Sequence, residues 1–261
     1  MRLKDMGDEA VLLAAGGRAI LLQLANPAVG HAVAEHSSFA HDPTRRLRHT
    51  LTYVYALIWG TPQQAAVVTA MVNRAHGPVR SPSYSAIDPQ LQLWVNATLY
   101  DSAVMMHERV FGPLEPDDAD RIYEDYAIIG VALQMPRELW PATRADFRDY
   151  WDTSIENLRV DDVVRATAHT LLHPPTGPLW LRAAMPLAGF LTAGLLSPKL
   201  REEFALPWSD RRQKRFDRML RVTARLYPRL PLRLRHWPKR SLLATIPTGA
   251  AATTRFAEQP D

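Results

Sequence analysis

No cysteine occurs anywhere in the chain. The absence of thiols excludes disulfides, thiolate nucleophiles, iron–sulfur clusters, and zinc or haem held by a cysteine. Any metal would therefore have to be bound by histidine, a carboxylate, tyrosine or methionine. A protein without cysteine suits the cytosol and the periplasm equally, so this absence does not decide the compartment.

The sequence also lacks a long apolar run. The uncharged apolar stretch of residues 183–198 is short and contains Pro186 and two glycines, whereas a membrane-spanning helix needs about 20 predominantly apolar residues. We expect a buried helix pair there, with membrane contact as the alternative. Met1 to Ala10 carries charges of both signs and no apolar segment before a cleavage site, so no secretory signal is predicted. We expect a cytoplasmic protein.

Several signature motifs of enzymes are missing. The chain has no Gly-x-Gly-x-x-Gly sequence, no Walker loop, no Gly-x-Ser-x-Gly elbow and no His-Glu-x-x-His pair. Nucleotide-dependent enzymes, serine hydrolases of the elbow type and zincins therefore have no support.

Acidic residues are nearly absent from one stretch near the C-terminus. Between Arg211 and Arg240 there are twelve Lys or Arg residues and one acidic residue, Asp217. Such a segment can meet nucleic acid or anionic lipid. Its arginines recur close to helical spacing, however, which favours the solvated face of an amphipathic helix. We predict no nucleic-acid partner, and leave peripheral membrane contact open.

The apolar residues follow helical periodicity through most of the chain, and no segment alternates long enough to predict a strand. We predict an all-α fold with about nine helices in one domain, residues 1–247, followed by a flexible tail, residues 248–261. Asn26-Pro27, Gly60 and Gly77-Pro78 mark helix ends, and Asp88 is a good N-cap. The expected helices cover residues 8–25, 28–38, 44–59, 62–76, 89–111, 117–130, 144–157 and 160–172, with others starting near 179 and 209.

Polar side chains share one face of the expected helix 44–59. Arg46, His49, Thr50 and Tyr53 fall at positions i, i+3, i+4 and i+7. A buried charge needs a partner, which a ligand with carboxylates would provide. The alternative is that Arg46 pairs with a carboxylate of the protein.

Glu35 and Asp101 are the carboxylates that this alternative would use for Arg46. Arg80 follows His76 by four residues, but the helix is expected to break at Gly77-Pro78, which places Arg80 on a loop beside the histidine. On spacing alone, a structural histidine in the core or at the surface is the favoured interpretation of His76. Periodicity does not go further than this.

A series of short motifs in order along the chain resembles the DUF2236 family, which includes rubber oxygenase (latex-clearing protein) and fungal MpaB-type oxygenases. The resemblance covers most of the chain. It rests on Asn26-Pro27-Ala28-Val29, Phe39, Asp42-Pro43, the run from Arg46 to Tyr55, His76-Gly77, Tyr84-Ser85-Ala86, Asp88-Pro89, the run from Leu93 to Leu99, and Asp101-Ser102, with weaker signals at Pro141-Ala142-Thr143 and Leu206-Pro207-Trp208.

The resemblance implies a globin-like core around haem b, with His76 as the proximal ligand of the iron. Arg46 and Thr50 match an Arg-x-x-x-Thr pair that is implied to hold the haem propionates or line the pocket. His49 stands where rubber oxygenase has a lysine that can cap the distal side of the iron. We hypothesise that His49 is a distal ligand or hydrogen-bond donor; a pocket-wall role is the alternative. Glu35 is a weak candidate for the catalytic base.

The remaining candidate cofactor-binding residues are Tyr53, Arg80, Asn96 and Asp101. Asp101 would accept a hydrogen bond from a histidine, or instead pair with Arg46. Asn96 departs from the family, in which many members have histidine in the Trp-Val-His-Ala-Thr motif. Asn73 likewise replaces an arginine that is often found three residues before the proximal histidine. Both departures put activity in doubt.

The function implied by the resemblance is a haem b-dependent oxygenase acting on a small apolar, isoprenoid-like or unsaturated substrate with molecular oxygen. Two alternatives remain: a non-catalytic protein that binds haem or an apolar ligand, and a haem-free helical interaction protein that uses the basic segment. The sequence leaves the oligomeric state, the substrate and the electron donor undetermined.

Overall fold

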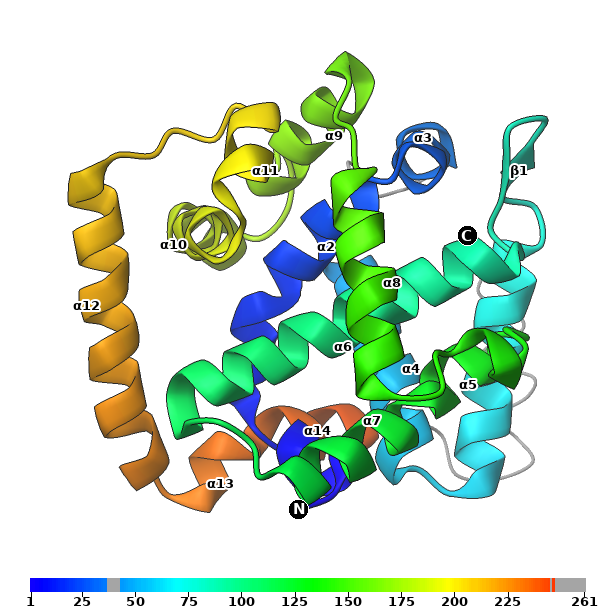
Figure 1. Cartoon of the computed structure of the whole chain (residues 1–261), viewed down its shortest axis with the longest axis horizontal. Coiled ribbons are helices and arrows are strands. Elements are labelled where there is room, and N and C mark those ends of the chain that lie inside the picture. The colour runs from blue at the N-terminus through cyan, green and yellow to red at the C-terminus, as the bar shows by residue number, and fades with distance from the viewer. Residues whose placement is uncertain (37–42, 245, 247–261) are drawn as a thin grey trace.

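Helices form nearly all of the regular structure in the computed structural model (Figure 1). The model describes residues 1–36, 43–244 and 246, and for residues 36 and 43–47 it describes the backbone without the side chains. The two strands, β1 (Arg80–Ser81) and β2 (Tyr84–Ser85), pair in one short antiparallel hairpin. The predicted all-α class is confirmed. The predicted tail, residues 248–261, lies outside the described residues.

The described part of the chain contains fourteen α-helices, more than the nine or so predicted. The extra helices are short, because a segment of four to seven residues carries too little periodicity to be recognised. The fourteen helices are α1 (Leu3–Gly7), α2 (Gly16–Leu24), α3 (Pro27–His36), α4 (Pro43–Trp59), α5 (Pro62–His76), α6 (Pro89–Phe111), α7 (Pro116–Val131), α8 (Arg144–Glu156), α9 (Asp162–Leu172), α10 (Leu179–Leu195), α11 (Pro198–Glu203), α12 (Asp210–Leu226), α13 (Leu232–Arg235) and α14 (Trp237–Leu243). Three 3₁₀ turns accompany them, η1 (Ala10–Ala15), η3 (Arg137–Leu139) and η4 (Tyr227–Arg229).

Local chemistry sets the helix boundaries where the sequence predicted them. Asp88 caps α6 by accepting a hydrogen bond from the backbone N–H of Gln90 at 2.8 Å. Thr61 caps α5 in a reciprocal capping box with Gln64. Both helices have proline in the first turn, where a missing N–H leaves no bond unmade. α5 ends at His76 before Gly77, as expected.

Helix α6 runs through the middle of the molecule (Figure 1). It contacts α2 and η1, α7, and α12. Residues from all sides of its surface are buried, which is typical of a helix enclosed by others. Because α6 is the shared neighbour, it positions the elements that carry the candidate site.

The apolar core consists of three clusters that meet along α6. The first contains an aromatic group in which the Tyr100 ring packs edge-on against Tyr123, Trp140 and Phe147, with ring centroids 5.0 to 5.8 Å apart. The second surrounds Trp94 and joins α6 to α2, α9 and α11. The third joins η1, α10 and α12 to the end of α6. This packing holds α6 between layers of helices.

Gly17 lets α2 lie directly against α10. A Cβ atom at this position would be 2.0 Å from Oγ1 of Thr192, a buried residue of α10. No side chain larger than hydrogen fits that contact without separating the two helices. Because η1 ends and α2 begins at this pair of glycines, the single helix expected over residues 8–25 is instead two elements.

Helices α4 and α5 form an antiparallel hairpin that turns at Gly60-Thr61 and contacts α14 and α1 through α4. The β1–β2 hairpin follows α5, and β2 contacts α3. No single helix in the described residues is long and apolar enough to cross a membrane; residues 10–24 and 27–35 meet the criterion only as a pair bent by 102°.

Candidate functional site

Two predicted iron ligands lie toward the same end of the α4–α5 hairpin. His49 precedes the end of α4 at Trp59 by ten residues, and His76 is the last residue of α5, fourteen residues after Pro62. With a rise of about 1.5 Å per residue, the two lie about 15 and 21 Å from the turn. Both are half-buried. Both histidines, 27 positions apart in the sequence, thus lie well away from the turn on two consecutive helices.

The polar face predicted on α4 is not uniformly buried. Tyr53 is buried and His49 half-buried, but Thr50 is exposed. The side chain of Arg46 lies outside the described part of the protein. The prediction that this face turns toward the interior is therefore wrong for Thr50. The proposed contact of Thr50 with a haem propionate stays a prediction.

Tyr53 and Asn96 meet at the last turn of α7. The Tyr53 hydroxyl donates to the carbonyl oxygen of Ile129 at 2.6 Å, and burial raises the pKa of Tyr53 well above its usual range. Asn96 on α6 lies against Gly130, where an added Cβ would be 3.1 Å from the amide nitrogen. The structure therefore brings these two predicted residues to adjacent peptide units of α7.

The amide of Asn96 is buried without a hydrogen bond. The residue is 2% exposed, and neither its oxygen nor its nitrogen has a hydrogen-bond partner among the described residues. Burying a polar group in this way costs about 1–3 kcal/mol. Such a group marks either local frustration or a place for a ligand.

We predict that Asn96→Leu raises the free energy of unfolding of the protein without added ligand, by about 1–2 kcal/mol, because leucine has nearly the same shape and no unsatisfied polar atoms. Urea denaturation measures the change. Asn157→Leu is the matched control: its amide donates to the Thr153 carbonyl at 2.9 Å in an exposed position, so it should give no gain. A loss of stability in Asn96→Leu would contradict the prediction.

Asp101 faces a different side of α6 from Asn96, since five residues turn a helix by about 140°. Its carboxylate forms a 2.7 Å ion pair with Arg18 of α2. Arg18 also donates to the Ser102 hydroxyl at 2.7 Å and to the Leu195 carbonyl at 3.2 Å. Burial raises the pKa of Asp101, although Arg18 acts in the opposite direction. The pair ties α2 and α10 to α6, and cofactor binding by Asp101 stays a prediction.

Glu35 lies near the end of α3 and is exposed. Its Oε2 accepts a hydrogen bond from the buried Tyr84 hydroxyl at 2.6 Å, which ties α3 to β2. Arg80 is exposed on β1, just after α5 ends at His76. The β-hairpin thus carries Arg80 and Tyr84 on the segment that leaves His76, as the broken helix predicted for Arg80.

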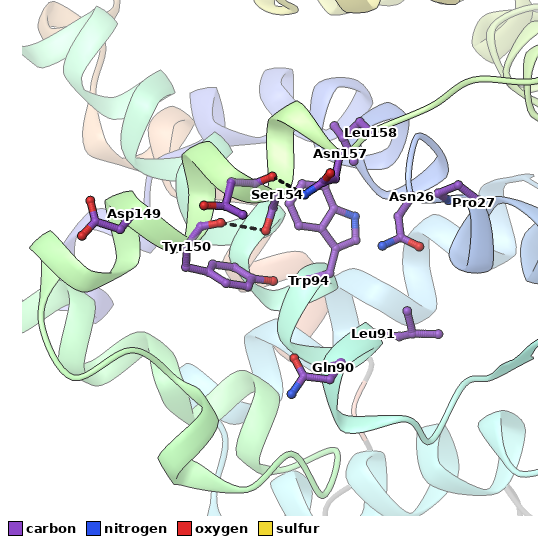
Figure 2. A pocket seen from close by; sticks show the side chains of 11 residues that line it. Asn26, Pro27, Gln90, Leu91, Trp94, Asp149, Tyr150, Ser154, Asn157 and Leu158 are labelled. Atoms are coloured by element: carbon purple, nitrogen blue, oxygen red, sulfur yellow. Dashed lines mark hydrogen bonds between the residues drawn. The ribbon is translucent and has the colours of Figure 1, made fainter.

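A pocket of about 530 Å³ opens between the start of α6, the start of α3 and α8 (Figure 2). The Trp94 ring lies near its centre, with Tyr150 and Asn26 to either side, and Gln90 and Asn157 at the edges (Figure 2). None of the predicted site residues lines it. The residues that line the pocket are Asn26, Pro27, Gln90, Leu91, Trp94, Asp149, Tyr150, Thr153, Ser154, Asn157 and Leu158.

No motif or spacing in the sequence pointed to Tyr150 as a pocket residue. Asn26 and Trp94 belong to the motifs that carry the family resemblance, but residues of α8 do not. The Trp94 indole donates to the Leu22 carbonyl at 3.2 Å, and its ring stacks on Trp151 at 5.5 Å. These contacts fix the aromatic wall of the pocket. The motif positions therefore signalled three of the eleven lining residues, Asn26, Pro27 and Trp94.

Comparison with known proteins places this architecture in a family. Residues 3–225 match the family model described as ER-bound oxygenase mpaB/B′/Rubber oxygenase, catalytic domain. The uncharacterised proteins Mb2261 of Mycobacterium bovis and Rv2237 of Mycobacterium tuberculosis are each 39% identical over 222 residues, covering 80% of this chain and 87% of theirs. No solved structure matches, so the predicted globin-like core stays a prediction. The chain belongs to the mpaB/B′ and rubber oxygenase catalytic-domain family.

Proposed function

We propose that this protein is a haem b-dependent oxygenase that acts on a small apolar, unsaturated substrate. The observation that carries the proposal is the match of residues 3–225 to a family of oxygenase catalytic domains. The two relatives described above are uncharacterised and add no activity. Haem and the substrate class come from the family resemblance and are the parts to be tested.

The two histidines of the α4–α5 hairpin suit haem better than a bare metal ion. A non-haem iron or zinc site needs about three protein ligands, and the described residues contain no group of three His, Cys, Asp or Glu side chains that could hold a metal. Haem needs only one or two axial ligands. Two half-buried imidazoles meet that requirement, so the donor set fits.

We assign His76 as the proximal ligand and His49 as the distal ligand or hydrogen-bond donor. Arg80, with Arg46 and Thr50, would neutralise the haem propionates through charge-assisted hydrogen bonds. When bound, haem would supply the binding and activation of molecular oxygen. The protein's part would be to orient the group, to anchor its acidic edge and to keep the reacting face dry.

Glu35 would act as the base through Oε1, because Oε2 already accepts the Tyr84 hydroxyl. That hydrogen bond fixes the orientation of the carboxylate relative to β2. Glu35→Gln would keep the size of the side chain and remove its basicity.

Oxygen uptake tests the activity. Protein supplied with haem should consume oxygen when given a short polyprenyl or an unsaturated fatty acid, and Glu35→Gln should slow uptake while leaving the haem spectrum unchanged. Uptake no greater than that of free haem, across apolar unsaturated substrates, would refute the oxygenase. The second candidate, a non-catalytic haem or apolar-ligand carrier, is favoured by Asn96, whose buried amide stands where many family members have histidine.

We predict that His49→Ala changes the haem from six-coordinate to five-coordinate if His49 ligates the iron. Removing the sixth ligand leaves one axial position open, which shifts the visible bands and the spin state. Absorption and electron paramagnetic resonance spectra of the ferric protein measure this. Asn73→Ala, on α5 and also half-buried, is the control and should leave the spectrum unchanged. An unchanged spectrum in His49→Ala would limit His49 to the wall of the pocket.

A further inference from the structure

The outer face of α12 is a cationic surface. Arg211, Lys214, Arg218, Arg221 and Arg225 are exposed and recur every three or four residues, so they lie along one side of the helix. The opposite side buries Phe216 and Leu220 in the third core cluster. A hollow of about 500 Å³ on the cationic side is lined by Arg211, Lys214, Arg215 and Arg218.

These charges are not used inside the protein. In the part of the chain that the structure describes, Arg211, Lys214 and Arg218 have no carboxylate within ion-pair distance. The basic residues further along behave differently: Arg235 is paired with Glu9, and Lys239 with Asp8 at 2.6 Å. The segment after α12 is thus anchored to the N-terminal region, while α12 itself keeps free cations.

Large apolar side chains are exposed beside the same charges. Val222 and Leu226 flank the cationic side of α12 and are 48% and 59% exposed. The chain that follows exposes four more such residues, Leu230 at 43%, Leu232 at 58%, Leu234 at 62% and Trp237 at 63%. Such a group is rare on a surface that meets only water.

We propose that α12 and the segment 226–237 form a docking surface for an anionic phospholipid membrane. Arginine and lysine attract the phosphate headgroups, and leucine and tryptophan enter the boundary between headgroups and acyl chains, as in interfacial amphipathic helices. α12 forms one edge of the molecule with α13 at its end (Figure 1), so a flat surface can approach both. Nucleic acid would satisfy the cations but not the exposed leucines. The proposal does not depend on the oxygenase activity.

Flotation of the full-length protein with vesicles tests the surface. The protein should bind vesicles of about three parts phosphatidylcholine to one part phosphatidylglycerol, and bind pure phosphatidylcholine at least about tenfold more weakly, because each basic residue near an anionic surface contributes about 1 kcal/mol. Raising the salt concentration should weaken binding without abolishing it, since the apolar contacts are not screened.

Matched variants separate this surface from net charge. Arg211→Gln/Lys214→Gln/Arg218→Gln should reduce binding to the anionic vesicles at least about tenfold. Lys4→Gln/Arg137→Gln/Arg148→Gln removes the same charges from exposed positions on α1, η3 and α8 and should bind like the parent. Leu232→Ser/Leu234→Ser/Trp237→Ser should lose the binding that survives at high salt. Circular dichroism verifies that each variant is folded.

Three results would overturn the proposal. The first is that the parent protein fails to bind anionic vesicles at low salt. The second is that the two triple charge variants lose binding equally, which would indicate an effect of net charge. The third is tight binding of duplex DNA or RNA that α12 substitutions abolish while vesicle binding stays weak, which would assign the surface to nucleic acid.

Discussion

Replacing His76 by alanine is expected to abolish the Soret band of the haem-loaded protein. An imidazole that ligates iron contributes a bond that no neighbouring group in the variant replaces, so haem affinity should fall by more than about a hundredfold, beyond what loss of a partner outside the ligand shell causes. Titration with haemin, followed by absorption after gel filtration, measures the loss. The expected effect is large because His76 ends α5 at a half-buried position, where a bound group would displace little packing.

His169→Ala is the matched control for His76→Ala. It removes a histidine that is exposed on α9 and stacks on His173, and it should leave the spectrum as in the parent. Added imidazole should restore a Soret band in His76→Ala, because the free ligand can occupy the vacated position. A band of full strength in His76→Ala without imidazole would show that another residue is the proximal ligand.

Replacing Arg18 by leucine is expected to lower the free energy of unfolding by about 3–5 kcal/mol at neutral pH. The substitution leaves the Asp101 carboxylate buried without its 2.7 Å partner and removes the bonds to Ser102 and to the Leu195 carbonyl. Three helices lose a common anchor. Urea denaturation of parent and variant measures the difference.

The loss should depend on pH in a defined direction. The pKa of Asp101 is already raised by burial in the parent, and without Arg18 it should rise further. A folded state with a raised carboxyl pKa prefers the protonated form, so its stability is greatest below the ordinary pKa of about 4 and is lost as the pH rises. The gap between parent and Arg18→Leu should therefore be wider at neutral pH than in mild acid.

The double variant Arg18→Leu/Asp101→Asn supplies the control. Removing the charge of the carboxylate as well should recover part of the lost stability at neutral pH and make the remainder independent of pH. If Arg18→Leu loses the same stability at both pH values, the ion pair contributes little, and packing of the arginine side chain explains the effect.

The helix boundaries could be predicted from the sequence because they depend on local chemistry. Pro62, Asp88 and Gly77 act within one helical turn of themselves, and each boundary occurs where they predict it. The all-α class follows from the same periodicity. Short helices such as α13 and α14 could not be found this way, because tertiary contacts rather than periodicity hold them.

The pairings that shape the candidate site could not be predicted, because they join residues far apart in the chain. Tyr84 donates to Glu35 from 49 positions away, and Arg18 pairs with Asp101 across 83. Asp101 was assigned to the site or to Arg46, and periodicity gave no reason to prefer Arg18. The burial of Asn96 was equally hidden, because a helix enclosed on all sides shows no polar face.

The resemblance singled out the two histidines, and the structure places both on the α4–α5 hairpin. His49 and His76 lie well away from its turn at Gly60-Thr61. Thr50, which the spacing placed on the same inward face, is exposed because that face spans the border between core and surface. Side-chain burial depends on which helices pack over α4, and spacing along one helix does not contain that information.

The most direct test is a haem titration of the parent protein. Haemin added in steps should develop a Soret band that saturates at one haem per chain, stays with the protein through gel filtration, and responds to carbon monoxide after reduction. Binding at one equivalent would support the haem b oxygenase. A protein that remains colourless, or takes up haemin without saturation, would contradict it and leave a helical domain of the oxygenase family that works without haem.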